Sequence, residues 1–149
     1  MHSVVFAIPY RHVMTRGRFV GIQVFIVHHK KSGYWVFPGG HVNEGESLHD
    51  AINREIWEEL GVWKFLEPEE APFFRNTITI NIPDYERGIH NNIWYLMPTD
   101  GSNFIIDLEN PDCEFTDVKW LSIKRAKRII GDPATQEALQ KLETMLLLS

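Results

Sequence analysis

One stretch of this chain predicts an amphipathic helix whose two sides have different tasks. From about residue 47 to residue 60 the sequence has helical periodicity, with Ser47 as a candidate N-cap and Gly61 as a candidate stop. Ile52, Ile56 and Leu60 recur at intervals of four residues, so they form an apolar stripe. Such a stripe must be covered by a sheet or by another helix, which points to a layered domain.

The polar side of the same helix carries three carboxylates. Glu55, Glu58 and Glu59 are related as i, i+3 and i+4, which places them on one helix face. Like charges at these spacings destabilise an isolated helix by roughly 0.2–0.5 kcal/mol per pair, so we expect a partner that offsets the repulsion. Magnesium is such a partner, because carboxylates and substrate phosphates are its usual ligands. The alternative is a solvated acidic face on which Arg54 pairs with Glu58.

A glycine-rich loop precedes the helix. Residues 39–46 contain three glycines, and we expect the Pro38-Gly39-Gly40 segment to be irregular. Glycine lets the backbone approach a ligand closely. A glycine-rich loop that leads into an acidic helix therefore favours a metal–phosphate site, although a pair of glycines alone would indicate only a tight turn.

Residues rich in β-branched and aromatic side chains mark strands along the rest of the chain. The expected strands are residues 3–8, 19–28, 34–37, 76–82, 90–97 and 115–121. A short helix is expected at 123–130, and an amphipathic helix at 132–148. The 149 residues contain no repeat, linker or low-complexity tract. The sequence thus predicts an α/β fold with a mixed β-sheet in a single domain spanning residues 1–149.

Charge and cysteine content exclude several functions. The net charge of −5 disfavours a nucleic-acid polymer or a membrane surface as partner, whereas bound cations would still let the protein hold an anionic small molecule. Residues 1–9 lack the basic and apolar pattern of a signal peptide, and a single cysteine, Cys113, allows no intrachain disulfide. These features predict a cytoplasmic protein. A homodimer is left open.

Histidines give no sign of a zinc enzyme. The acidic helix lacks a His-x-x-x-His pair, which disfavours catalytic zinc. His41, in the glycine-rich loop, either contacts a phosphate of the substrate or shapes the loop. Trp57 lies away from both the carboxylates and the apolar stripe on a helical projection, so we expect it to be exposed.

The loop and helix together resemble the Nudix box, G-x5-E-x7-R-E-U-x-E-E-x-G-U, where U is a bulky aliphatic residue. The fixed positions are filled by Gly40, Glu46, Arg54, Glu55, Ile56, Glu58, Glu59, Gly61 and Val62. Residues 35–40 are similar to the strand that enters the box, and residues 114–121 to a late strand with a tryptophan, here Trp120. Asn43 departs from the family in a loop position that often holds glutamate, but the strict pattern leaves this position free.

This resemblance implies an α/β/α sandwich and a catalytic site that depends on Mg²⁺, with Mn²⁺ as a substitute. Glu55, Glu58 and Glu59 correspond to the metal-binding glutamates, and the carbonyl of Gly40 to a further ligand. Arg54 corresponds to a residue that orients the carboxylates, and Glu46 to one that holds the loop and helix together.

Further site residues are implied around this box. In MutT-type members a glutamate beyond the box completes the metal site or acts as the base, and Glu114, six residues before Trp120, stands in that place. The base is therefore either Glu55 or Glu114. Gly39, Gly40 and His41 are the expected substrate-binding residues.

The expected reaction is hydrolysis of a diphosphate linkage in a nucleoside diphosphate joined to another group, by attack of water on phosphorus. Residues 77–80 are Thr-Ile-Thr-Ile, so the proline of many ADP-ribose hydrolases and the tyrosine of dinucleoside polyphosphate hydrolases are both missing from the region about fifteen residues past Val62. The expected substrate is a nucleoside triphosphate or a modified nucleotide. A nucleotide sugar, such as ADP-ribose or a GDP-sugar, is an alternative. Another is a non-catalytic nucleotide-binding module, although such modules typically lose box glutamates that are all present here.

Overall fold

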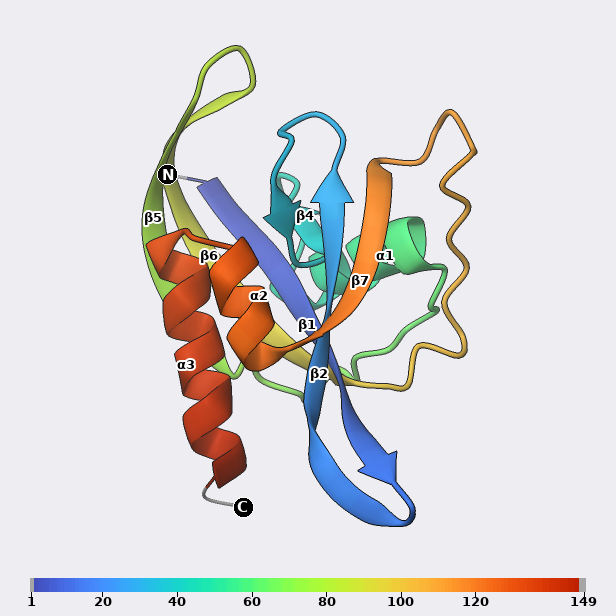
Figure 1. Cartoon of the computed structure of the whole chain (residues 1–149). Helices are drawn as coiled ribbons and strands as arrows, with labels where there is room; N and C mark the ends of the chain where they lie inside the picture. Colours follow the sequence, from blue (N-terminus) through green and yellow to red (C-terminus); the bar gives the residue numbers. More distant parts are fainter. Residues whose placement is uncertain (1, 148–149) are drawn as a thin grey trace.

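The computed structural model describes residues 2–147, in which seven strands form one mixed sheet and three helices cover it (Figure 1). The strands are β1 (His2–Thr15), β2 (Arg18–His29), β3 (Trp35–Val36), β4 (Gly39–His41), β5 (Phe74–Ile82), β6 (Glu86–Pro98) and β7 (Phe115–Ser122). The helices are α1 (Leu48–Leu60), α2 (Ile123–Ile129) and α3 (Pro133–Leu147). The predicted α/β fold with a mixed sheet is confirmed, and residue 148 of the predicted last helix lies outside the described residues.

The sheet divides between β1 and β2. These strands pair as an antiparallel hairpin from Tyr10↔Val24 to Thr15↔Arg18 and then separate. Beyond the hairpin β1 pairs with β4 and, in parallel, with β6, whereas β2 pairs with β7 and β3. The separation leaves a free edge of β1 on which the glycine-rich loop can pair.

Strand β4 corrects one expectation from the sequence. The sequence predicts that Gly39 and Gly40 are irregular, but they pair with Phe6 and Val5 of β1 as a short antiparallel strand. A Cβ at Gly39 would lie 2.0 Å from the carbonyl oxygen of Val5, so only glycine allows the two backbones to come this close. The glycines thus serve a close backbone approach within the sheet.

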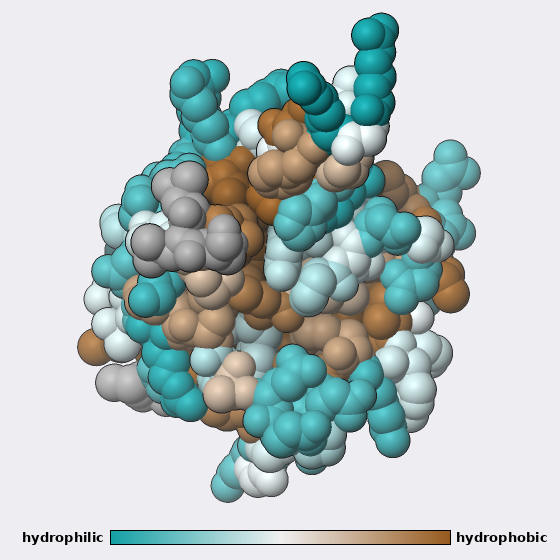
Figure 2. Space-filling model, turned by 90° about the horizontal axis from the view of Figure 1, so that it is seen from below, coloured by the Kyte–Doolittle hydropathy of each residue, from teal (hydrophilic) through white to brown (hydrophobic). Residues whose placement is uncertain are grey.

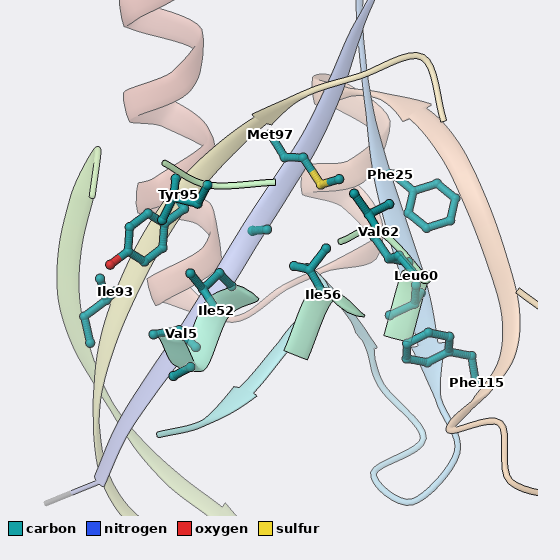
Figure 3. Close-up of a cluster of buried hydrophobic side chains, with 14 residues drawn as sticks. Val5, Phe25, Ile52, Ile56, Leu60, Val62, Ile93, Tyr95, Met97 and Phe115 are labelled. Atoms are coloured by element: carbon teal, nitrogen blue, oxygen red, sulfur yellow. The ribbon is translucent and has the colours of Figure 1, made fainter. Parts of the chain in front are cut away.

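Helices lie on both faces of the sheet, which gives the expected α/β/α sandwich. On one face α1 packs over a core that includes Ile52, Ile56, Phe25 and Met97 (Figure 3). On the other face α2 and α3 pack over a second core, to which α3 contributes the fully buried side chains of Ala138, Leu139 and Leu142. Each buried aliphatic side chain contributes about 1.5–3 kcal/mol to folding relative to an exposed one.

Helix α1 has the ends and the apolar stripe that the sequence predicts. The hydroxyl of Ser47 accepts a hydrogen bond from the backbone N–H of Asp50 at 3.0 Å. Gly61 ends the helix in the left-handed conformation, φ 70°, and its N–H donates to the carbonyl of Trp57 at 3.1 Å. Ile52, Ile56 and Leu60 each have 0% of their surface exposed. These contacts fix how α1 rotates and therefore where its carboxylates point.

Several apolar side chains lie on the surface. Trp57 is exposed as expected, and its ring meets that of Trp63 edge to face. The β1–β2 hairpin exposes Met14, Phe19 and Val20. Figure 2 shows the molecule from below, with apolar surface among hydrophilic groups. Among residues 2–147, none of the helices combines the length and apolarity needed to cross a bilayer.

Candidate active site

The polar face of α1 meets the backbone of β4. The N–H of Gly39 donates to both carboxylate oxygens of Glu59, at 3.1 and 3.3 Å. The carboxyl group of Glu55 lies directly against Gly40, where an added Cβ would come within 2.5 Å of it. The two positions therefore require glycine for different reasons. Gly39 lies against the backbone of β1, and Gly40 leaves room for the carboxylate of Glu55.

Arg54 connects the loop to the acidic face of the helix. Its Nε and Nη2 donate to the two oxygens of Glu46 at 2.8 and 2.9 Å, in a bidentate pair. Its Nη1 donates to Glu55 at 2.8 Å and, more weakly, to Glu58 at 3.4 Å. Nη2 also donates to the carbonyl of His41 at 3.0 Å. The Arg54–Glu58 pair of the sequence alternative is present at 3.4 Å, and the shorter bonds to Glu46 and Glu55 accompany it.

The contacts between Arg54 and Glu46 shift the pKa values of both residues. The hydrogen bond from Arg54 holds the pKa of Glu46 below its usual value. The same bond raises the pKa of Arg54, so the guanidinium stays charged. A permanent cation of fixed orientation thus holds Glu46 and Glu55 in place.

The remaining carboxylates crowd one another. Burial raises the pKa of Glu55, against the opposing effect of Arg54. Burial raises the pKa of Glu59 well above its usual value, and the negative charge of Glu55 raises it further. Glu59 is partly buried and its carboxylate accepts from the N–H of Gly39, whereas Glu58 is exposed. The helical pattern places both Glu58 and Glu59 outside the core, and only Glu58 lies fully at the surface.

Glu114 joins this group from a distant part of the chain. It precedes β7, and its backbone carbonyl accepts a hydrogen bond from the N–H of Lys30 at 2.8 Å. Its negative charge helps to raise the pKa of both Glu55 and Glu59, which places it within electrostatic range of both. Four carboxylates therefore gather at one end of α1, and an all-oxygen donor set of this kind fits a hard divalent cation.

A cavity of about 580 Å³ opens beside the carboxylates. Gly39, Gly40 and Glu59 line its polar end. Its apolar wall includes Phe6, whose ring stacks on that of Trp94 with centroids 4.6 Å apart. This volume is within the usual range of roughly 300–1,000 Å³ for small-molecule sites. The cavity can thus hold an apolar ring system while presenting phosphates to the carboxylates.

A second polar group lines the same cavity, and sequence reasoning missed most of it. The ring of His41 turns away from the carboxylates and contacts Glu86, which also accepts from Nε2 of His90 at 3.1 Å. His90 is almost fully buried, and burial lowers its pKa. The signal in the sequence is weak: Glu86, Gly88 and His90 share one face of a strand, and Gly88 carries no side chain between the other two.

Comparisons with known proteins agree with this geometry. A family model described as the NUDIX domain matches residues 11–142. Nudix hydrolase 2 of Arabidopsis thaliana is 42% identical over 57 residues, which cover 29% of this chain and 20% of that protein. An RNA pyrophosphohydrolase of Shewanella piezotolerans is 33% identical over 104 residues, which cover 59% of this chain and 56% of the relative. The chain therefore spans at most about half the length of these two relatives.

Solved structures show the same fold. A C. elegans Ap4A hydrolase in a binary complex superposes with a TM-score of 0.70 and 18% identity, covering 98% of this chain and 99% of that one. The match of the family model over most of the chain, together with the complete box, establishes that this chain belongs to the Nudix family. The resemblance noted in the sequence is confirmed.

Proposed function

We propose that this protein hydrolyses a phosphoanhydride bond in a nucleoside triphosphate or a modified nucleotide, with Mg²⁺ as cofactor and Mn²⁺ as a substitute. One observation carries the proposal: four carboxylates gather beside a glycine backbone, and one of them, Glu59, lines a cavity that also has aromatic side chains on its wall. The carboxylates suit a diphosphate with its cation, and the aromatic side chains suit a nucleobase. The membership of the Nudix family gives the same reaction class.

Glu55, Glu58, Glu59, Glu114 and the carbonyl of Gly40 are the residues that would hold the cation. When bound, the cation would supply charge neutralisation at the phosphates and acidify a water molecule. Arg54 orients Glu55, and the N–H of Gly39 orients Glu59. Glu55 or Glu114 would act as the general base and accept a proton from the attacking water. The aromatic wall would exclude solvent from the nucleobase.

The choice of a mononucleotide rests on charge and on the cavity. Ile78, Thr79 and Ile80 of β5 line the cavity where some families carry a proline or a tyrosine, so this wall is aliphatic. The net charge of −5 opposes binding of a long polyanion. Because one relative is an RNA pyrophosphohydrolase, 5′-triphosphorylated RNA is the strongest competing substrate.

A substrate panel tests the proposal. The protein is incubated with natural and modified nucleoside triphosphates, ADP-ribose, a GDP-sugar, Ap4A and 5′-triphosphorylated RNA, and release of phosphate and pyrophosphate is measured. We expect the highest kcat/KM for a mononucleotide, and no turnover in excess chelator. A higher kcat/KM for the RNA or for a nucleotide sugar would overturn the substrate class, and full turnover in chelator would overturn the cofactor.

Two variants test the proposed metal ligands in this assay. Glu58→Gln and Glu59→Gln should each lower turnover by orders of magnitude while the protein stays folded, as judged by circular dichroism. Glu58→Gln is the cleaner variant because the side chain of Glu58 is exposed. Turnover near that of the wild type in both variants would remove these residues from the site.

A further inference from the structure

His41, Glu86 and His90 form a compact group on the wall of the candidate active-site cavity. Nε2 of His41 and Nε2 of His90 both approach the same oxygen of Glu86. One candidate ligand atom from each residue can be chosen so that all lie within 4.8 Å of one another. The group differs from the box carboxylates in its candidate ligand atoms, which come from two imidazoles and one carboxylate.

The sheet itself brings these side chains together. Glu86 and His90 lie on one face of β6, with Gly88 between them. His41 pairs with Val4 of β1, and β1 also pairs in parallel with β6, so three neighbouring strands converge. The site is therefore built on paired strands that hold its residues in register, which suits precise ligand geometry.

Gly88 leaves space between Glu86 and His90, and the ring of His2 lies next to this space. A side chain there would project between Glu86 and His90 on the same face, and the nearest side-chain atom to it belongs to His2, at 3.9 Å from the Cβ position. The ring of His2 lies edge-on to both His41 and His90, with centroids 5.5 and 6.0 Å away. Two imidazoles thus contact one carboxylate, and a third imidazole lies against both of them.

We propose that His41, Glu86 and His90 form a second metal site, which binds Zn²⁺ or a similar transition-metal ion that prefers imidazole ligands. In a tetrahedral zinc site with bonds of about 2.0–2.1 Å, two ligand atoms lie about 3.4 Å apart. The 3.1 Å separation of His90 and Glu86 is close to this spacing, and His41 contacts the same oxygen of Glu86.

Ligand chemistry separates this site from the one at the box. Imidazole suits Zn²⁺, Co²⁺ and Ni²⁺, whereas carboxylates and water suit Mg²⁺. The two sites should therefore load with different metals from a mixture. Since His41 follows Gly40 directly, an ion at the second site would tie β4 to β6 and stiffen the wall of the cavity.

Metal binding itself tests the inference, without reference to hydrolysis. Zn²⁺ is titrated calorimetrically into the full chain in saturating Mg²⁺, and Co²⁺ binding is followed by its visible absorption. We expect one bound Zn²⁺ per chain. We expect the Co²⁺ absorption spectrum to be typical of a low-coordinate ion with nitrogen ligands. His41→Ala, His90→Ala and Glu86→Gln should each weaken Zn²⁺ binding by at least about 100-fold.

Control variants distinguish this site from surface histidines and from the box carboxylates. His12→Ala removes an exposed imidazole on the same strand as His2 but outside the group, and should leave Zn²⁺ binding unchanged. A Glu58→Gln, Glu59→Gln double variant should still bind Zn²⁺, because its changes lie in the box.

Two of the three ligand variants keep the test valid even if the loss of the buried His90 disturbs the fold. The side chain of His41 is largely exposed, and Glu86→Gln is an isosteric change, so both variants should fold normally. Zn²⁺ binding that persists in these two variants, or that is lost in the box double variant, would overturn the inference.

Discussion

At the scale of single residues, Arg54 determines the geometry of the candidate site. Its guanidinium donates to Glu46, Glu55, Glu58 and the carbonyl of His41, and so joins the loop to the helix. Lysine has the same charge but a single nitrogen, which cannot reproduce this fork. The role expected of this residue from the family pattern therefore has a specific geometric basis.

Arg54→Lys should lower both the affinity for Mg²⁺ and kcat by roughly 10–100-fold, because the residues that orient metal ligands usually have effects of this size. The measurement is the Mg²⁺ dependence of turnover. Arg18→Lys, on the exposed β1–β2 hairpin, is the matched control and should behave as the wild type. If Arg54→Lys binds Mg²⁺ normally, charge alone suffices and the fork has no role.

At the scale of elements, β4 contains two adjacent glycines whose neighbours differ in kind. A Cβ at Gly39 would meet the rigid backbone of β1, whereas a Cβ at Gly40 would meet the end of the Glu55 side chain. A backbone cannot move aside without breaking strand pairing, but a side chain can. The same substitution should therefore have two different effects.

Gly39→Ala should destabilise the fold by several kcal/mol, as expected for severe overpacking. Gly40→Ala should keep most of the stability but displace Glu55 and lower Mg²⁺ affinity and turnover. Urea denaturation and Mg²⁺ titration, run on both variants, give the comparison. Equal losses of stability in the two variants would contradict this account of β4.

The C-terminal end of α1 depends on a third glycine. Gly61 has φ 70°, and an added Cβ would lie 2.8 Å from the Cβ of Ile105. Gly61→Ala should therefore cost about 1–3 kcal/mol in unfolding free energy, from the left-handed backbone and from the crowding. Gly131→Ala, where a Cβ would meet nothing within 4 Å, should change stability by no more than about 0.5 kcal/mol. Urea denaturation of both variants measures the difference.

At the scale of the whole molecule, the fold holds negative charge that it does not itself neutralise. The pKa of Glu59 is raised well above its usual value, mainly by burial, so the folded protein binds a proton more tightly than the unfolded chain. The contribution of Glu59 to stability therefore falls as pH rises from the ordinary glutamate range through its raised pKa. A bound cation would remove this cost, because it stabilises the ionised carboxylates.

In excess chelator, the stability of Glu59→Gln relative to the wild type should increase as pH rises from the ordinary glutamate range through the raised pKa of Glu59, because the variant has no charge to bury. The stability advantage of the variant should therefore be largest at neutral and alkaline pH and should shrink on acidification. Urea denaturation at a series of pH values measures it. A difference in stability between the two proteins that does not change with pH would show that Glu59 ionises without cost.

Added Mg²⁺ should reverse this trend in the wild type, with a gain in stability that grows with pH as protons leave the carboxylates. The same competition predicts that turnover at limiting Mg²⁺ falls steeply on the acid side, and that the optimum lies on the alkaline side of neutrality. An acidic optimum, or an acid limb that ignores the Mg²⁺ concentration, would contradict the carboxylate site.

Local spacing in the sequence is enough to determine helix α1. Its caps, its apolar stripe and its carboxylate face all depend on residues within a few positions of one another, and helical geometry converts such spacing directly into direction. The box pattern has the same local character. For this reason the family, the layered fold and the set Glu55, Glu58 and Glu59 can all be predicted from the sequence.

Only the tertiary structure decided how distant segments meet. The pairing of β4 with β1 turned an expected irregular loop into a strand, and Gly39 of this strand donates its N–H to Glu59. The placement of Glu86 and His90 beside His41 depends on which strands become neighbours, whereas the resemblance to the family already implied that Glu114 joins the box carboxylates. Strand neighbours are chosen by burial over the whole sheet, because each strand alone is compatible with many partners, and no local pattern in this sequence carries that choice.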